Sequence, residues 1–201
     1  AGQADTGPGI LAARREGIPV VTVDGEFPGT PREAFIGTNN KDFGRAMAAT
    51  LRRMMPSGGR IGVITGGANA PALVERLVGL RDALGDDFVE VEGSPFESEG
   101  DPLKALEVAR QLASADPPLK AIVSLGAWPM LDPDGWRAFA LERKDRIDRA
   151  DLLLLVADAL PEQRALLNEG LVHALVAPRA RDLGARSLSI LVDLSRRQQT
   201  A

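Results

Sequence analysis

The chain has 201 residues, of which 44% are hydrophobic and 26% are charged. This is the composition of an ordinary globular protein, long enough for one large domain or two small lobes. The formal net charge of −4 argues against a nucleic-acid partner, and the absence of cysteine excludes disulfides, thiolate nucleophiles and cysteine-based metal sites.

Six short apolar runs, rich in β-branched residues and bounded by Gly, Pro or Asp, predict strands. In chain order they are residues 20–23, 60–65, 88–91, 121–124, 152–156 and 173–177. Between them, apolar residues recur at helical spacing, as Phe43, Met47, Leu51 and Met54 do. This alternation predicts an α/β fold with a mainly parallel sheet and helices on both faces.

Several predicted helices have recognisable starts, where a capping residue comes shortly before a proline. The capping candidates are Asn69, Asp101 and Asp132. Two segments, residues 25–34 and 145–149, are interpreted as surface connections because the first is rich in Gly and Pro and the second is charged. The longest apolar run, residues 152–157, is too short to span a bilayer, so we do not expect a membrane-inserted protein.

The sequence lacks the motifs of common catalytic sites. It contains neither the Gly-x-Ser-x-Gly of a nucleophile elbow nor a phosphate-binding loop of the Gly-x4-Gly-Lys type. The only histidine, His173, cannot build a histidine-rich metal site or the usual serine-protease triad, and its apolar neighbours favour structural packing. We therefore predict no enzyme activity, no catalytic residues, no cofactor and no metal.

Two carboxylates follow predicted strands directly. Asp24 ends the strand at residues 20–23, and Asp158 follows the apolar run 152–157. Ligands of parallel α/β sheets dock at the carboxyl ends of the strands, and a carboxylate there can accept hydrogen bonds from two adjacent sugar hydroxyls. The alternative is that each Asp caps the turn that follows it.

Trp128 and Asn69 are further candidates in loops after predicted strands. The indole of Trp128 could stack on a sugar ring or fill a gap between a helix and the sheet. The segment Gly66-Gly67-Ala68-Asn69 could aim backbone N–H groups at a ligand from a helix start, or it could be a tight turn with an Asn cap. Trp136 lies on a predicted helix, and we interpret it as a residue that packs in the core.

Motifs along nearly the whole chain resemble, in order, those of the type I periplasmic sugar-binding proteins of the ribose-binding type, and of the related effector domains of lac-repressor-like regulators. The motifs are GIPVVTVD, IGTNNKDFGRAMAATL, GGRIGVITG with VERLVGLRDAL, AIVSLGAWPM, and LLLLVADALPEQRALLNEGLVHALVAPRARDLG. This resemblance implies two Rossmann-like lobes with parallel sheets, which close around a ligand by a hinge motion.

The resemblance also implies a division of the chain. Residues 1–39 would be a remnant of an incomplete first lobe, residues 40–177 the second lobe, and residues 178–201 a crossover and a helix that return to the first lobe. Hinge residues would be Thr38, Asn39, Asn40, Ala177 and Pro178. Relative to that family, the opening strands of the first lobe are missing from this sequence, so either the sequence is a fragment of a longer protein or a second chain completes that lobe.

By position, Asp24 and Glu26 would supply the ligand contacts of the first lobe, and Asn69, Trp128 and Asp158 those of the second. The chain departs from the family pattern at Gly126-Ala127, where the family has polar Asn-Asp. This departure argues against a pentose site like that of the ribose-binding type.

The resulting expectation is a solute-binding protein of an ABC transporter that binds a sugar or sugar-like polyol and delivers it to a permease. It would be periplasmic, with its signal peptide outside this sequence, because the opening AGQADTGPG lacks a charged start and an apolar stretch. The alternative is the effector domain of a lac-repressor-like transcription regulator, which a Lys- and Arg-rich helical segment upstream would favour. A doubly wound enzyme is a third reading, against which the missing catalytic motifs count.

Overall fold

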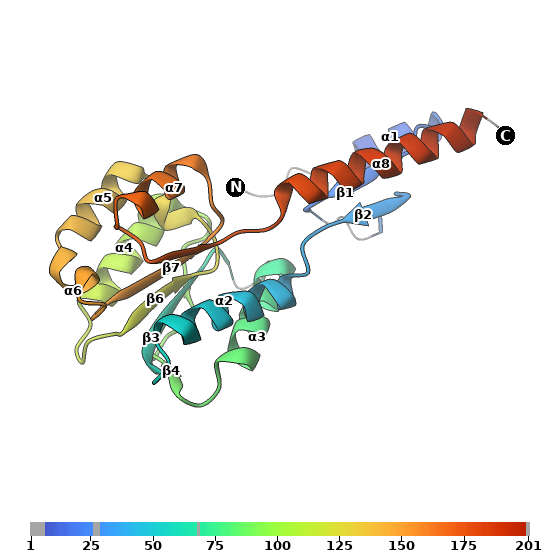
Figure 1. Cartoon of the computed structure of the whole chain (residues 1–201). Helices are drawn as coiled ribbons and strands as arrows, with labels where there is room; N and C mark the ends of the chain where they lie inside the picture. Colours follow the sequence, from blue (N-terminus) through green and yellow to red (C-terminus); the bar gives the residue numbers. More distant parts are fainter. Residues whose placement is uncertain (1–6, 26–28, 68, 200–201) are drawn as a thin grey trace. The chain divides into compact units, whose positions relative to one another are not determined.

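The computed structural model describes residues 7–25, 29–67 and 69–199 (Figure 1). The chain divides into two compact units. The central unit is Asn40–Ala177, and the terminal unit is made of the chain before Asn40 and the chain after Ala177. The α/β fold with parallel sheets predicted from the sequence is confirmed: all strand pairs in the described residues are parallel, and helices connect most of the strands.

The central unit contains one parallel sheet between two layers of helices (Figure 1). The strands, in spatial order, are β4 (Phe88–Glu90), β3 (Gly59–Thr65), β6 (Ala121–Ser124), β7 (Leu153–Ala157) and β8 (Ala174–Val176), and the short β5 (Phe96–Glu97) pairs with the end of β3. The helices are α2 (Asn40–Met54), α3 (Pro71–Leu84), α4 (Pro102–Ala113), α5 (Pro133–Leu141), α6 (Lys144–Asp148) and α7 (Pro161–Asn168), and a 3-10 turn η1 spans Trp128–Met130.

The predicted strands of the central unit are all present, with bounds that differ by at most a residue or two at either end. Asp101 and Asp132 cap α4 and α5 as predicted, because each carboxylate accepts a backbone N–H from the first turn. The prediction for residues 145–149 was wrong, since most of that segment forms α6. Its charges pair along the helix, Lys144 with Asp148, while Ile147 is buried, so a helical turn is stabilised where the composition resembled a loop.

Alternate strand residues build two separate apolar cores, one on each face of the sheet. On one face Ile61, Val63 and Val123 pack against α2 and α3. On the other face, in what is here called the second core, Ile122 and Leu154 pack against α4, α5 and α7. The central strands β3, β6 and β7 are thus buried on both sides, which explains why each of their sequences is a continuous apolar run and not an alternating one.

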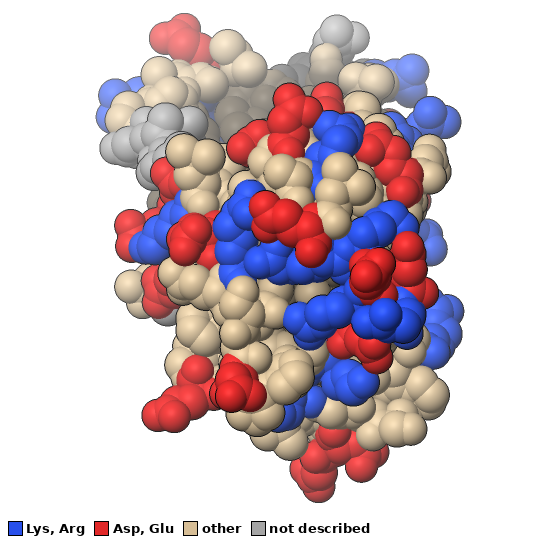
Figure 2. Space-filling model, turned by 90° about the vertical axis from the view of Figure 1, so that its left-hand side faces the viewer, with Lys and Arg blue, Asp and Glu red and all other residues tan. Residues whose placement is uncertain are grey.

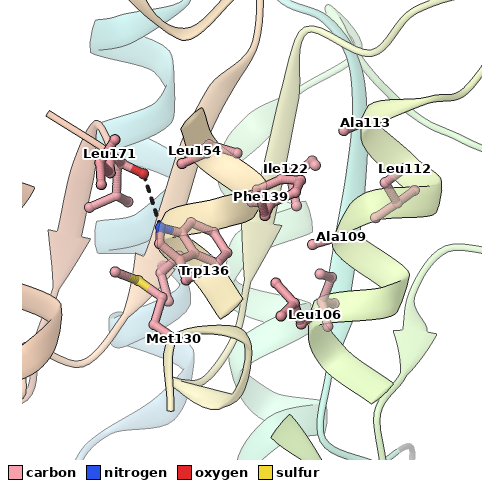
Figure 3. Close-up of a cluster of buried hydrophobic side chains, with 14 of the residues drawn as sticks. Leu106, Ala109, Leu112, Ala113, Ile122, Met130, Trp136, Phe139, Leu154 and Leu171 are labelled. Atoms are coloured by element: carbon pink, nitrogen blue, oxygen red, sulfur yellow. Dashed lines mark hydrogen bonds between the residues drawn. The ribbon is translucent and has the colours of Figure 1, made fainter. Parts of the chain in front are cut away.

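Trp136 of α5 lies at the centre of the second core (Figure 3). Only 1% of its surface is exposed, and its ring packs against Phe139 with the ring centroids 5.1 Å apart. The indole Nε1–H donates a 3.0 Å hydrogen bond to the Leu171 carbonyl oxygen, drawn as the dashed line in Figure 3. The packing role predicted for this residue is confirmed.

Helices α2 and α3 cross at two glycines. A Cβ added to Gly44 would lie 2.0 Å from the carbonyl oxygen of Arg76, and a Cβ added to Gly79 would lie 1.9 Å from that of Lys41. Since the obstructing atoms belong to the backbone, a side-chain rotation cannot relieve either clash. The two helices therefore depend on these glycines for their close approach.

We expect Gly79→Ala to lower the free energy of unfolding of the central unit by about 3 kcal/mol, because the added methyl group forces the helices apart. Urea unfolding followed by far-UV circular dichroism measures the change. The control is Gly67→Ala in the same unit, where an added Cβ would meet nothing within 4 Å. Equal stability of the two variants would contradict this explanation of the helix crossing.

The terminal unit consists of α1 (Gly7–Arg15), β1 (Val21–Val23), β2 (Ala34–Ile36) and α8 (Ala180–Gln199). Its two strands pair in parallel, with Val21 opposite Ala34 and Val23 opposite Ile36. Several of its apolar side chains are exposed: Leu11, Ile18, Val23, Phe35, Leu188 and Val192. A two-stranded sheet has little stability of its own, so completion of this unit by a second chain stays a prediction.

Candidate ligand-binding site

The carboxyl ends of the central strands meet at one edge of the sheet, here called the ligand edge. The register aligns them, because Ile64 of β3 pairs with Ser124 of β6, and Ser124 pairs with Val156 of β7. Beyond these ends come Gly66, the Leu125–Gly126 segment and Asp158. The topology thus brings three predicted candidates, Asn69, Trp128 and Asp158, to loops of the same edge.

Asp158 directly follows β7 and has a left-handed backbone, with φ of 71°. Its backbone N–H donates a 2.7 Å hydrogen bond to the carbonyl oxygen of Val176, the last residue of β8. This conformation is uncommon for residues other than glycine, although Asp and Asn tolerate it. The chain thereby turns sharply out of the sheet and leaves the half-buried Asp158 side chain at the ligand edge.

Asp24 has the same local geometry in the terminal unit. Its φ is 63°, and its N–H donates a 2.9 Å hydrogen bond to the carbonyl oxygen of Ile36, the last residue of β2. The residues before the two carboxylates also correspond, since Val23 pairs with Ile36 and Ala157 with Val176. Each unit therefore holds an aspartate in the same strained turn after a parallel strand. Such strain at a non-glycine residue is typical of functional positions.

Trp128 lies across the ends of two neighbouring strands. A Cβ added to Gly66, after β3, would come within 2.5 Å of its indole ring, and so would one added to Gly126, after β6. The ring is half-buried and packs against the second core. Both glycines leave room for the indole, so Trp128 has the packing role considered above, and it still exposes part of its surface at the ligand edge.

The remaining predicted residues have varied positions. Asn69 is exposed in the turn before α3, but Ala70 occupies the N-cap position without a side-chain hydrogen bond, so the prediction of an Asn69 cap was wrong. The extended backbone of Ala70, followed by Pro71, starts the helix without an Asn cap.

Glu26 lies outside the described residues. Of the hinge candidates, Asn40 is the first residue of α2, while Thr38, Asn39, Ala177 and Pro178 lie in connections between a strand and a helix.

Arg76 of α3 was not predicted from the sequence, yet it joins three parts of the central unit. Its guanidinium donates to the Asn40 side-chain oxygen, with Nη2 at 2.8 Å, and to the backbone carbonyl of Leu125 beyond β6. It also lies over the Phe43 ring, 4.1 Å from the centroid. Arg76 therefore connects the start of α2 with the ligand edge.

His173 has a structural role, as its apolar neighbours suggested. Its Nδ1 accepts a 3.1 Å hydrogen bond from the Leu154 backbone N–H, and its Nε2 lies 3.1 Å from the Ile147 carbonyl oxygen. An imidazole that accepts at Nδ1 and donates at Nε2 is neutral. Burial lowers the pKa of His173 below its ordinary value, while the bond to Ile147 and the charge of Asp148 oppose that effect.

The lowered pKa of His173 predicts pH-dependent stability. The unfolded imidazole takes up a proton more readily than the folded one, so its contribution is present above the ordinary pKa of 6.5 and declines as the pH falls through the depressed folded value. Urea unfolding at a series of pH values below 7 measures this decline. His173→Asn keeps an acceptor near Nδ1 but does not titrate, so its stability should decline less; parallel profiles would refute this assignment.

The outer surface of the central unit carries charges of both signs. Figure 2 shows Lys and Arg side chains interspersed with Asp and Glu on the face that lies at the left in Figure 1. Ion pairs between helices of the central unit and neighbouring segments include Arg137 with Glu169 and Arg110 with Glu142. No helix in residues 7–25, 29–67 and 69–199 is long and apolar enough to cross a membrane. The same residues contain no group of three or more His, Cys, Asp or Glu that could hold a metal ion.

Comparisons with known proteins agree on one family. A family model described as "Periplasmic binding protein domain" matches residues 4–199. The D-allose-binding periplasmic protein of Escherichia coli K12 is 26% identical over 194 residues, which cover 92% of this chain and 60% of that protein. The chain thus spans about 60% of the length of this curated relative.

Solved structures of similar proteins share the fold. A sugar-binding protein of a sugar ABC transporter from Bacillus halodurans is 25% identical, with a TM-score of 0.77 over 95% of this chain and 64% of the other. An ABC transporter solute-binding protein from Burkholderia graminis C4D1M, solved in complex with D-arabinose, is also 25% identical. Its TM-score is 0.74 over 92% of this chain and 64% of the other.

Proposed function

Because the chain belongs to the periplasmic binding protein domain family, we propose that it is the solute-binding component of an ABC transporter and binds a sugar or sugar-like polyol. Asp158 carries this proposal. A carboxylate held at the ligand edge by a left-handed turn can accept hydrogen bonds from two neighbouring hydroxyls. The half-buried indole of Trp128, at the same edge, offers a flat apolar surface to the C–H face of a sugar ring.

Asp24 is proposed to contribute a second carboxylate, since its turn repeats the geometry of Asp158. Glu26 and Asn69 are proposed to add polar contacts. The connections that contain Thr38, Asn39, Ala177 and Pro178, with Asn40 at the start of α2, are proposed to act as the hinge. The names of the relatives reported above support a periplasmic location and a part in sugar ABC transport, and we propose that the protein delivers its ligand to a permease.

Isothermal titration calorimetry tests the proposal directly. The purified protein is titrated with a panel of aldohexoses, aldopentoses and polyols, and we expect saturable one-to-one binding of at least one of them. Amino acids and small carboxylic acids form the comparison panel. Binding confined to that second panel, or the absence of heat with every sugar and polyol, would contradict the proposed ligand class.

A further inference from the structure

Gln163 is a buried polar side chain that no sequence motif singled out. It lies in the first turn of α7 and only 1% of its surface is exposed. Buried amides need hydrogen-bond partners, because an unsatisfied polar group in the interior is destabilising. The partners of Gln163 show which parts of the protein it holds.

Both ends of the Gln163 amide bind the loop that carries Asp158. Its Oε1 accepts a 2.9 Å hydrogen bond from the Leu160 N–H, and its Nε2 donates a 2.9 Å hydrogen bond to the Ala157 carbonyl oxygen. These two backbone groups stand on either side of Asp158. Together with the bond from the Asp158 N–H to Val176, they fix the strained turn at three points.

The same amide reaches the neighbouring loop of the ligand edge. Gln163 Nε2 lies 3.9 Å from the sulfur of Met130, which is itself 1% exposed. Met130 belongs to the 3-10 turn η1 that begins with Trp128. One buried side chain therefore contacts the loop of Asp158 after β7 and the turn of Trp128 after β6.

We infer that Gln163 is a positioning residue that sets the Asp158 turn and the Trp128 turn in one arrangement, so that ligand affinity depends on it without direct contact. This inference rests on the function proposed above. A simpler role is conceivable for a Gln at this position, because a Gln or Glu in the first turn often accepts the N–H of the N-cap residue, here Leu160. The bond to Ala157 distinguishes the two roles, since only positioning requires a donor.

Gln163→Glu separates the acceptor from the donor. The introduced carboxylate still accepts the Leu160 N–H, and helix capping is retained. In its ionised form it has no hydrogen for the Ala157 carbonyl, so we expect affinity for the sugar found in the panel to fall about tenfold or more at alkaline pH. When the pH is lowered, protonation restores a donor, and the affinity should recover relative to the wild type at the same pH.

Two further variants complete the test. Gln163→Leu removes donor and acceptor together, so its affinity should be reduced at every pH. Gln111→Glu makes the same chemical change at an exposed position of α4 and should bind like the wild type. Thermal unfolding confirms that each variant is folded. Equal affinity of the wild type and of Q163E in its ionised form overturns the inference, because capping would then suffice.

Hydrogen exchange of the ligand-free protein decides the inference independently of sugar binding. We expect the Asp158 amide, which donates to Val176, to exchange faster in Q163L, and in Q163E in its ionised form, than in the wild type at the same pH. If the wild type binds no sugar but exchange at Asp158 rises in both variants, the proposed function fails and the positioning role stands. Unchanged exchange at Asp158 in both variants overturns the positioning role.

Discussion

Replacing Asp158 by Asn is expected to weaken sugar binding about 100-fold, since hydrogen bonds to a charged group contribute about 1.5–3 kcal/mol each. Asn tolerates the left-handed conformation that Asp158 adopts, so the backbone turn is retained. The change therefore removes the charge and one acceptor without adding strain, which Asp158→Ala would do. Isothermal titration calorimetry with the sugar identified in the panel measures the loss.

The matched control for D158N is Asp134→Asn in α5. The Asp134 side chain is 96% exposed and takes part only in a surface ion pair with Arg137 among the described contacts, so we expect wild-type affinity. Comparable affinities of D158N and the wild type would remove Asp158 from the ligand site. A loss in D134N equal to that in D158N would instead indicate an effect of net charge.

Trp136→Ala is expected to lower the free energy of unfolding of the central unit by about 3–5 kcal/mol. The substitution opens a cavity in the second core and leaves the Leu171 carbonyl oxygen without its indole donor. Since whole domains are stable by only about 5–15 kcal/mol, a large part of the stability would be lost. Urea unfolding followed by circular dichroism measures it.

Trp128→Ala is the control for this prediction, because it removes the same side chain from a half-buried position at the ligand edge. We expect a smaller loss of stability, as part of the Trp128 ring is already in water. A greater loss in W128A than in W136A would show that Trp128 is mainly a core residue. Its place in the proposed ligand site would then be withdrawn.

Most strands could be predicted because their apolar runs are continuous and both faces are buried, as in Ala121–Ser124. The short β5 could not, because Phe96–Glu97 pairs only with the end of β3 and carries no pattern of its own. The helix α6 within the charged segment at residues 145–149 could not be predicted either, because the composition of that segment resembles that of a loop. Its helix depends on the burial of Ile147 and on ion pairing, and neither is evident from composition.

The candidate site could be predicted in part. Asp24 and Asp158 follow apolar runs directly, and their position at strand ends needs only the local pattern. Arg76 and Gln163 could not be found in this way. Gln163 meets Met130 from 33 positions along the chain, and Arg76 meets Leu125 from 49 positions along it. Such contacts depend on how the helices pack on the sheet.

By itself, the sequence determined the alternation of strands and helices and the aspartates that end two strands, because these features depend on neighbours along the chain. Only the tertiary structure decided that the two aspartates share one strained turn geometry and that the Trp128 ring lies over Gly66 and Gly126. It also decided that one buried amide contacts the loops of Asp158 and Trp128. The physical reason is that strand register and helix packing join segments that are distant in the sequence.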